Sequence, residues 1–207
     1  MRAGARRCML LSRGSPAGPR PPRFETTERK KEMIRKGREE DIPAVAEIYS
    51  RILEREAGGQ GRTGWQKGVY PTADTAREAV EQGDLYVLEE NGAVAAAGRI
   101  NGEQVDVYAD CPWQYPAPAE QVLVLHTLVV DPQAAGAGHG TRLVRFYEQL
   151  AREVGRPYLR IDTNERNTPA RTLYRSLGYR EAAVMPCTFN GISGIRLVCL
   201  EKYLGEG

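Results

Sequence analysis

Histidine and cysteine are scarce in this chain of 207 residues. The two histidines are His126 and His139, and neither they nor the four cysteines stand at the close paired spacing of zinc ligands. The cysteines also lack the dense pattern of a small disulfide-stabilised secreted domain. We therefore expect a protein without a metal, in a reducing and cytoplasmic compartment.

Long apolar runs are missing as well. Runs such as Ala93–Ala97 and Val122–Leu125 have the length of strands, whereas a membrane-spanning helix needs about 20 apolar residues. Charged residues make up 27% of the chain and hydrophobic residues 41%, which is an ordinary balance for a globular protein. We predict no membrane attachment.

The net charge of +2 is unevenly distributed. Residues 1–32 contain nine Lys and Arg against three Glu, so residues 33–207 carry a net charge of −4. A mildly acidic body does not favour a nucleic-acid partner. Because residues 1–32 are also rich in Pro and Gly and have no apolar periodicity, we predict a disordered basic extension. It is either sequence upstream of a natural start at Met33 or a mitochondrial targeting segment.

Strand and helix patterns alternate from residue 33 onwards, which predicts one mixed α/β domain over residues 33–204. Strands are expected at 33–36, 85–89, 93–101, 122–130, 158–163, 180–189 and 195–202. Helices are expected at 42–52, 75–82, 143–154 and 168–177. Two loops, 58–72 and 102–121, are long enough to have a function.

The segment from Val130 to Thr141 joins a strand to a helix and has glycines at positions 136, 138 and 140. Unshielded backbone amides at the start of a helix can bind phosphate oxygens. The Rossmann fingerprint would need a glycine at Thr141, and a P-loop would need a lysine, so neither motif applies. A flexible glycine turn without a ligand is the alternative.

The second informative segment is Asn167–Tyr179, which contains Asn-Thr-Pro-Ala-Arg-Thr-Leu-Tyr and ends in Leu-Gly-Tyr. Helical spacing puts Ala170, Leu173, Tyr174 and Leu177 on one face. On this pattern alone, Tyr174 could be a core aromatic residue and Asn167 a helix N-cap.

Together the two segments resemble the GNAT (GCN5-related N-acetyltransferase) superfamily. Its first motif is Val-x-Pro followed by Arg/Gln-x-x-Gly-x-Gly/Ala, and its second is Asn-x-x-Ala-x-x-Leu-Tyr-x-x-x-Gly-Phe/Tyr. The second motif matches at every position, whereas in the first the usual Arg or Gln is replaced by Ala135. The resemblance implies a single α/β domain with a mostly antiparallel sheet, splayed between its fourth and fifth strands and covered by helices on both faces.

The resemblance also implies an acetyl-CoA-dependent N-acetyltransferase, in which an amine attacks the thioester directly in a ternary complex. Tyr174 would be the general acid to the CoA thiolate, and Asn167 would bind the pantetheine arm. The remaining cofactor-binding residues would be Leu128, Val129, Val130, Ala135, Gly136, Ala137, Gly138, His139, Gly140 and Thr141.

His126 is a candidate general base, because alternation along the strand puts it on the same face as Leu128. It could equally be a hydrogen-bonded strand residue. His139 is expected to be a surface side chain. Asp162, at the predicted end of a strand beside the cleft, is another candidate for the base and for contact with the substrate.

The acceptor is less defined than the cofactor. Trp65, Tyr70 and Trp113 fall in the two long loops, which we expect to cover the acceptor site. These side chains suit a small-molecule amine or a peptide N-terminus as the acceptor. We expect the protein to be a monomer or a homodimer. The alternative is a non-catalytic acyl-CoA-binding or sensor domain of the same fold.

Overall fold

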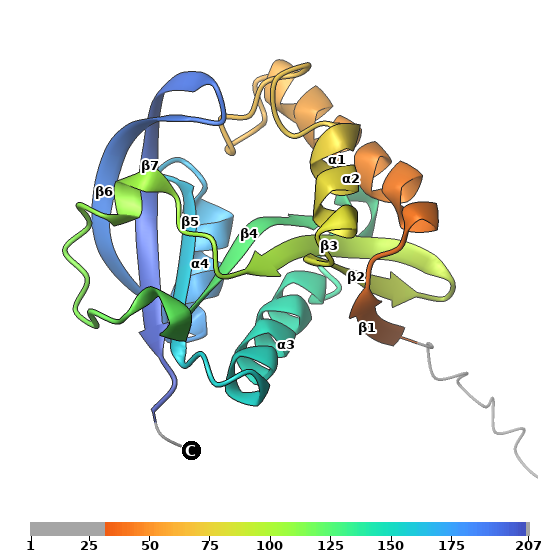
Figure 1. Cartoon of the computed structure of the whole chain (residues 1–207). Helices are drawn as coiled ribbons and strands as arrows, with labels where there is room; N and C mark the ends of the chain where they lie inside the picture. The colour runs from red at the N-terminus through yellow and green to blue at the C-terminus, as the bar shows by residue number, and fades with distance from the viewer. Residues whose placement is uncertain (1–31, 206–207) are drawn as a thin grey trace, which may run out of the picture.

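The computed structural model describes residues 32–205 of the chain, and the predicted basic extension lies almost wholly outside them. The described residues form one seven-stranded sheet with the strand order β1-β2-β3-β4-β5-β7-β6 (Figure 1). The strands are β1 Glu32–Lys36, β2 Leu85–Glu90, β3 Ala93–Asn101, β4 Val122–Val130, β5 Tyr158–Asn164, β6 Arg180–Phe189 and β7 Ile192–Tyr203. Only β4 and β5 pair in parallel. The predicted single domain with a mostly antiparallel sheet is confirmed.

Four helices cover the two faces of the sheet (Figure 1). The helices are α1 Ile42–Ala57, α2 Ala73–Glu81, α3 His139–Glu153 and α4 Thr168–Ser176. Helices α1 and α2 pack on one face, where Val45 and Ile48 contact Val87 of β2 and its neighbours. Helices α3 and α4 belong to the larger core on the other face, which contains Leu143 and Tyr174. Burial of these apolar stripes is the main force that holds the helices to the sheet.

The sheet opens between β4 and β5, as predicted. Their parallel pairing ends at Leu125 and Ile161, so the rest of β4 has a strand partner only in β3. An irregularity lies at the same point: Gly98 of β3 faces both Thr127 and Leu128, and Thr127 has a φ of 49°. An extra residue in one strand is a β-bulge, which bends and twists that strand.

The bulge corrects the prediction for His126. Leu128 packs in the same core cluster as Leu123 and Leu125, so the alternation of side chains reverses at Thr127. His126 therefore lies on the face of β4 opposite to Leu128. Strict period-two alternation did not anticipate this, because nothing in the sequence marks a non-glycine bulge.

The loop 102–121 forms a layer of its own rather than an open lid. It contains two short 3₁₀ helices, Asp106–Tyr108 and Ala119–Gln121. Tyr108 and Cys111 of this loop are buried in a cluster with Val124 of β4 and Cys199 of β7. The loop therefore covers the C-terminal half of the sheet on the side where α1 and α2 cover the N-terminal half.

Candidate acetyl-transfer site

A groove of about 440 Å³ runs along the free edge of β4 towards the start of α3. Its walls are the end of β4, the N-terminal part of α4 and the loop that follows α1. The predicted site residues Leu128, Val129, Val130, Ala135, Gly140, Asn167 and Tyr174 all line it. Gly136, Ala137, Gly138, His139 and Thr141 do not line this groove.

The glycine segment has the geometry of an anion-binding turn. Gly138 is the N-cap of α3 with a φ of 82°, and Gly136 has a φ of 87°, so both need the left-handed conformation. A Cβ on Gly140 would lie 3.3 Å from Leu173 of α4 and 3.5 Å from Val130. Gly140 therefore lets α3 begin close to β4 and α4, and the first amides of α3 have no partner within the helix.

A short ion pair anchors the start of this turn. The carboxylate of Asp131 accepts a hydrogen bond from the backbone amide of Gln133 at 2.9 Å. Its other oxygen lies 2.6 Å from a guanidinium nitrogen of Arg51 in α1. The turn is thereby tied to a helix on the opposite face of the sheet.

His139 is buried, so the prediction of a surface side chain is wrong. The residue is 1% exposed, and its Nδ1 accepts a hydrogen bond from Arg142 at 2.6 Å. Its Nε2 lies 3.7 Å from a carboxylate oxygen of Glu90 in β2. The side chain thus helps to hold α3 on the sheet, which leaves only the backbone of residue 139 for a ligand.

Two arginines in the groove were not anticipated from the sequence. Arg55, at the end of α1, and Arg62, in the following loop, line the same groove as Ala135. Arg62 donates a hydrogen bond to the hydroxyl of Thr168 at 2.9 Å, which places its guanidinium beside the start of α4. No sequence signal could have found them, because the groove brings them together with a motif more than 70 residues away.

Asn167 and Tyr174 stand between the groove and an inner cavity, because both line each of them. Asn167 is the N-cap of α4: its side-chain oxygen accepts from the amide of Ala170 at 3.4 Å, and its amide donates to Thr163 at 3.1 Å. Tyr174 is 4% exposed, and none of the described residues is hydrogen-bonded to its hydroxyl. Burial, together with the nearby Asp162, raises the pKa of Tyr174 above its usual range.

The inner cavity has a volume of about 80 Å³. Of the residues predicted to contact the acceptor, Trp65, Tyr70 and Asp162 line it, as does the candidate base His126. The rings of Trp65 and Tyr70 meet edge to face with centroids 5.8 Å apart. The hydroxyl of Tyr70 forms a hydrogen bond with that of Thr127 at the bulge. Apolar side chains of the β6–β7 hairpin complete the wall, namely Phe189, Ile192, Ile195 and Leu197.

Asp162 lies within β5 rather than at its end. It accepts a hydrogen bond from the hydroxyl of Tyr108 at 2.8 Å. Burial raises the pKa of Asp162 to about 6, although the hydrogen bond from Tyr108 acts in the opposite direction. A carboxyl group with this pKa is ionised near neutral pH and can still accept a proton.

One ring nitrogen of His126 forms hydrogen bonds with two oxygen atoms. Its Nε2 lies 3.0 Å from Oδ1 of Asn101 and 3.1 Å from the carbonyl oxygen of Glu103. Oδ1 of Asn101 also accepts from the amide of Glu103, so it is an acceptor and His126 Nε2 is the donor. Burial and the nearby Arg99 lower the pKa of His126 to about 4. The imidazole is therefore neutral at pH 7 and a weak base.

Trp113 does not line the inner cavity. Its indole nitrogen donates to the carbonyl oxygen of Tyr108 at 2.9 Å, and its ring packs under the guanidinium of Arg160. The loop 102–121 reaches the acceptor cavity through Tyr108 and its bond to Asp162 instead. Of the four residues predicted for acceptor contact, Trp113 is therefore the one that lies outside the inner cavity.

Within residues 32–205, no group of three or more His, Cys, Asp or Glu side chains could hold a metal ion. The helices of the same part of the chain are all too short or too polar to cross a bilayer.

Comparison with known proteins identifies the family. The model of the acetyltransferase (GNAT) family matches residues 43–179, which include the groove, the glycine turn and Tyr174. The chain belongs to this family. The prediction of a GNAT N-acetyltransferase is therefore confirmed at the level of the family.

Two curated relatives are both uncharacterized N-acetyltransferases. The Bacillus subtilis protein is 27% identical over 151 residues, which cover 72% of this chain and 89% of the relative. The Methanocaldococcus jannaschii protein is 31% identical over 87 residues, or 42% of this chain. This second match spans only 38% of the relative's length.

Solved structures agree on the fold of this GNAT protein. A GNAT-family acetyltransferase of Streptococcus agalactiae has a TM-score of 0.69 at 20% identity, over 84% of this chain and 96% of that one. YncA of Salmonella typhimurium, solved with its cofactor acetyl-CoA, has a TM-score of 0.61 at 21% identity, over 85% and 95%.

Proposed function

We propose that this GNAT protein transfers an acetyl group from acetyl-CoA to a primary amine by direct attack in a ternary complex. The observation that carries the proposal is the meeting of Tyr174 and Asp162 in one small cavity that joins the groove. A group that can supply a proton and a group that can accept one thereby line the same space where the amine would react.

The groove fits the parts of acetyl-CoA. The free edge of β4 from Leu128 to Val130 offers unpaired backbone groups to the pantetheine amides, in the manner of an added strand. The turn from Ala135 to Thr141 offers backbone amides to the pyrophosphate. Ala135 stands where the family usually has Arg or Gln and has no polar side chain for the pyrophosphate. Arg55 and Arg62, which line the same groove, supply positive charge there instead. The mildly acidic body can therefore hold a polyanion.

Acetyl-CoA supplies the thioester, and Tyr174 acts at its sulfur. A thiol has a pKa of about 8.5. Because burial raises the pKa of Tyr174, its phenol stays protonated and donates a hydrogen bond to the sulfur as negative charge develops there. Because the pKa of Tyr174 is raised, complete transfer of its proton to the thiolate is less favourable. Tyr174 therefore stabilises the leaving thiolate mainly through its hydrogen bond to the sulfur.

Asp162 receives the proton of the attacking amine. The residue is half-buried, its carboxylate has one oxygen that is not used by Tyr108, and its pKa of about 6 suits a base near neutral pH. His126 is the weaker candidate, because its Nε2 donates to Asn101 and Glu103 and its pKa is lowered. We therefore assign the base to Asp162 and a positioning role to His126.

The cavity also limits the acceptor. With about 80 Å³ between aromatic and aliphatic walls, it admits an amine on a slender chain but not a bulky secondary amine. A small-molecule amine and a peptide N-terminus both meet this requirement. A screen of acetyl-CoA consumption over amines, amino acids and peptides identifies the acceptor.

The test of the proposal replaces Tyr174 with Phe. The Tyr174→Phe variant should bind acetyl-CoA as the parent does and lose about 100-fold in kcat, because the lost hydroxyl acts only as the thiolate leaves. Tyr179→Phe is the matched control, since its ring lies 6.0 Å from that of Tyr174 but lines neither the groove nor the cavity. Unchanged kcat in Tyr174→Phe would refute the acid role. Absence of thiol release from the parent across the whole screen would indicate an acyl-CoA-binding domain instead.

A further inference from the structure

Arg160 of β5 is a buried cation without an anionic partner. The residue is 6% exposed, and no carboxylate oxygen of the described residues lies within 4.0 Å of its guanidinium nitrogens. Its one hydrogen bond in this part of the chain goes to the side chain of Gln104. A guanidinium has five N–H donors, so most of its hydrogen-bonding capacity is unused. Its unpaired nitrogens are not among the fully buried atoms without a partner, so they face solvent in a recess and can exchange that water for an anion.

The nearest buried carboxylate is already engaged. Glu201 of β7 stands opposite Arg160 in the sheet. Its two oxygens accept from the backbone amides of Gln114 and Tyr115 at 2.8 and 3.1 Å, and one of them also pairs with Arg180 at 2.8 Å. Glu201 therefore fastens the loop 102–121 to the sheet, and its charge acts on Arg160 through space without a direct ion pair.

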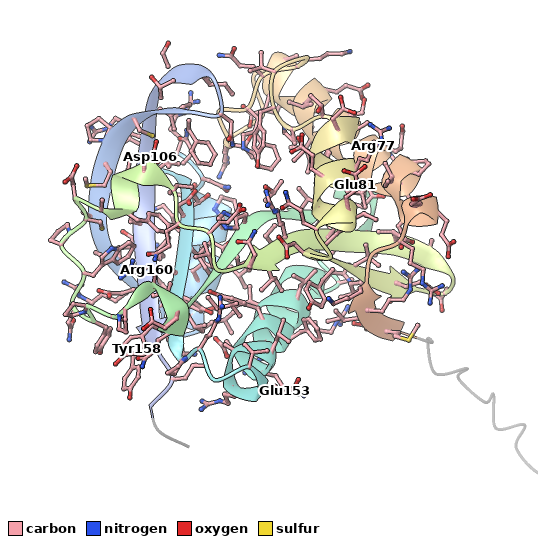
Figure 2. The ribbon with its side chains drawn as sticks, viewed as in Figure 1. Arg77, Glu81, Asp106, Glu153, Tyr158 and Arg160 are labelled. Atoms are coloured by element: carbon pink, nitrogen blue, oxygen red, sulfur yellow. The ribbon has the colours of Figure 1, made fainter. Side chains whose placement is uncertain are left out.

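Arg160 lines a cavity of about 730 Å³ beneath the loop 102–121. Figure 2 labels Arg160 on the sheet and Asp106 on the loop at this side of the molecule. The guanidinium carbon lies 4.3 Å from the ring centre of Trp113, which supports one face of the planar cation. The wall is about equally polar and apolar, and its apolar part comes from Val105, Pro112, Pro116, Ala117 and Ala119.

The side chains that line this cavity indicate the chemical class of its ligand. A guanidinium fixed on an aromatic ring presents its edge to a carboxylate and can bind it through two parallel hydrogen bonds. Asp106, the acidic residue of the lining, is exposed and disfavours a second negative charge on the ligand. We infer that this cavity binds a small organic monocarboxylate, with its carboxylate on Arg160 and its apolar body against the proline-containing loop.

This site is separate from the acetyl-transfer site. Its lining shares no residue with the inner cavity or with the acetyl-CoA groove. A direct link is Tyr108, which lines the carboxylate cavity and donates its hydroxyl to Asp162. The inference therefore goes beyond the proposed function, and a binding measurement tests it without any assay of acetyl transfer.

The test is a fluorescence titration of Trp113. The chain has two tryptophans, so a Trp65→Phe background leaves Trp113 as the single indole. Cyclohexanecarboxylate is the probe and cyclohexanecarboxamide its uncharged match. The carboxylate should give a saturable change with a Kd at least about tenfold lower than that of the amide, because only the carboxylate pairs with Arg160. Equal binding of the two, or binding of neither, overturns the inference.

Two variants locate the site. Arg160→Gln should remove the preference for the carboxylate, whereas Arg145→Gln, which removes an exposed arginine from α3, should leave it intact. Ala119→Phe fills the mouth of the cavity from an exposed position and should weaken binding about tenfold with Arg160 in place. If Arg160→Gln does not fold, the affinity of Ala119→Phe for the carboxylate tests the location of the site by itself. Unchanged affinity in Ala119→Phe or in a folded Arg160→Gln would overturn the assignment.

Discussion

The two halves of the proposed acetyl-transfer site are built in different ways. The acetyl-CoA half consists mainly of backbone: the free edge of β4, the turn at Gly138 and the first turn of α3. The acceptor half consists of side chains that come from separate elements, such as Trp65 before α2, Asp162 in β5 and Phe189 in β6. Backbone groups tolerate changes of side chain as long as the conformation survives, whereas a cavity of side chains changes with each substitution.

The difference has a consequence for how the two halves respond to mutation. In the acetyl-CoA half, damaging substitutions should be those that alter the backbone or add a like charge, and they should affect the binding of acetyl-CoA. In the acceptor half, substitutions that change a single functional group should affect turnover and leave the affinity for acetyl-CoA unchanged. Variants at Gly138, Asp162 and His126 test this division.

The largest effect is expected at Gly138. A Gly138→Glu variant forces a side chain into a φ of 82° and puts a negative charge at the amides proposed to bind the pyrophosphate. Loss of two hydrogen bonds to a charged group corresponds to a fall of about 1000-fold in the affinity for CoA, measured by calorimetry. Gly138→Asn is the matched control, since Asn tolerates this conformation without charge, and it should lose less than about tenfold. If Gly138→Glu bound CoA as tightly as the parent, the proposed anion-binding role of the turn would be refuted.

The residues of the proposed acetyl-CoA half that line the groove could be located from the sequence because their signals are local. The glycines at 136, 138 and 140 and the segment from Asn167 to Tyr179 lie in two short stretches, and the fold brings both to the groove. The element order could be predicted for the same reason, since apolar periodicity is a local property. Arg55 and Arg62 could not, because their place in the groove depends on the path of the loop after α1.

The second effect concerns Asp162 and the pH dependence of turnover. With a pKa of about 6, its carboxylate is protonated at lower pH and cannot accept a proton from the amine. In the parent, kcat/KM should rise with pH through about 6 and then level off. Asp162→Asn should abolish this rise and lower kcat at pH 8 by about 100-fold, while acetyl-CoA binds as before. The amide oxygen of Asn can still accept from Tyr108, so the packing is kept.

The stability of Asp162→Asn provides an independent check. Because the folded-state pKa of about 6 lies above the usual value of 3.8, the folded protein binds this proton more tightly than the unfolded chain. The ionised carboxylate is then destabilising, and its cost appears as the pH rises from about 4 through about 6. Asp162→Asn should therefore raise the melting temperature relative to the parent more at pH 7.5 than at pH 4. Asp110→Asn, at an exposed position in the loop 102–121, should show neither the kinetic nor the thermal effect.

The acceptor half was harder to predict because its residues meet only through the tertiary structure. Trp65 and Tyr70 were found as aromatic residues in a long loop, but the same reasoning selected Trp113, which packs on Arg160 instead. The bulge at Thr127 reversed the face of His126, and the burial of His139 depended on Arg142 and on β2. In each case the sequence shows the residue type, whereas a contact between distant segments decides its environment.

The smallest effect is expected at His126, and it separates the two candidate bases. Since its pKa is lowered to about 4, the imidazole does not change its charge between pH 5 and 8. In His126→Gln the amide N–H can replace Nε2–H as the donor to Asn101 and Glu103. We therefore expect kcat within about threefold of the parent, and the rise of kcat/KM through about pH 6 should persist. If that rise disappeared in His126→Gln and persisted in Asp162→Asn, the base would be His126. In that case β4 would supply both the base and the edge proposed to bind acetyl-CoA. The two halves of the site would then share one element and could no longer be treated as separate.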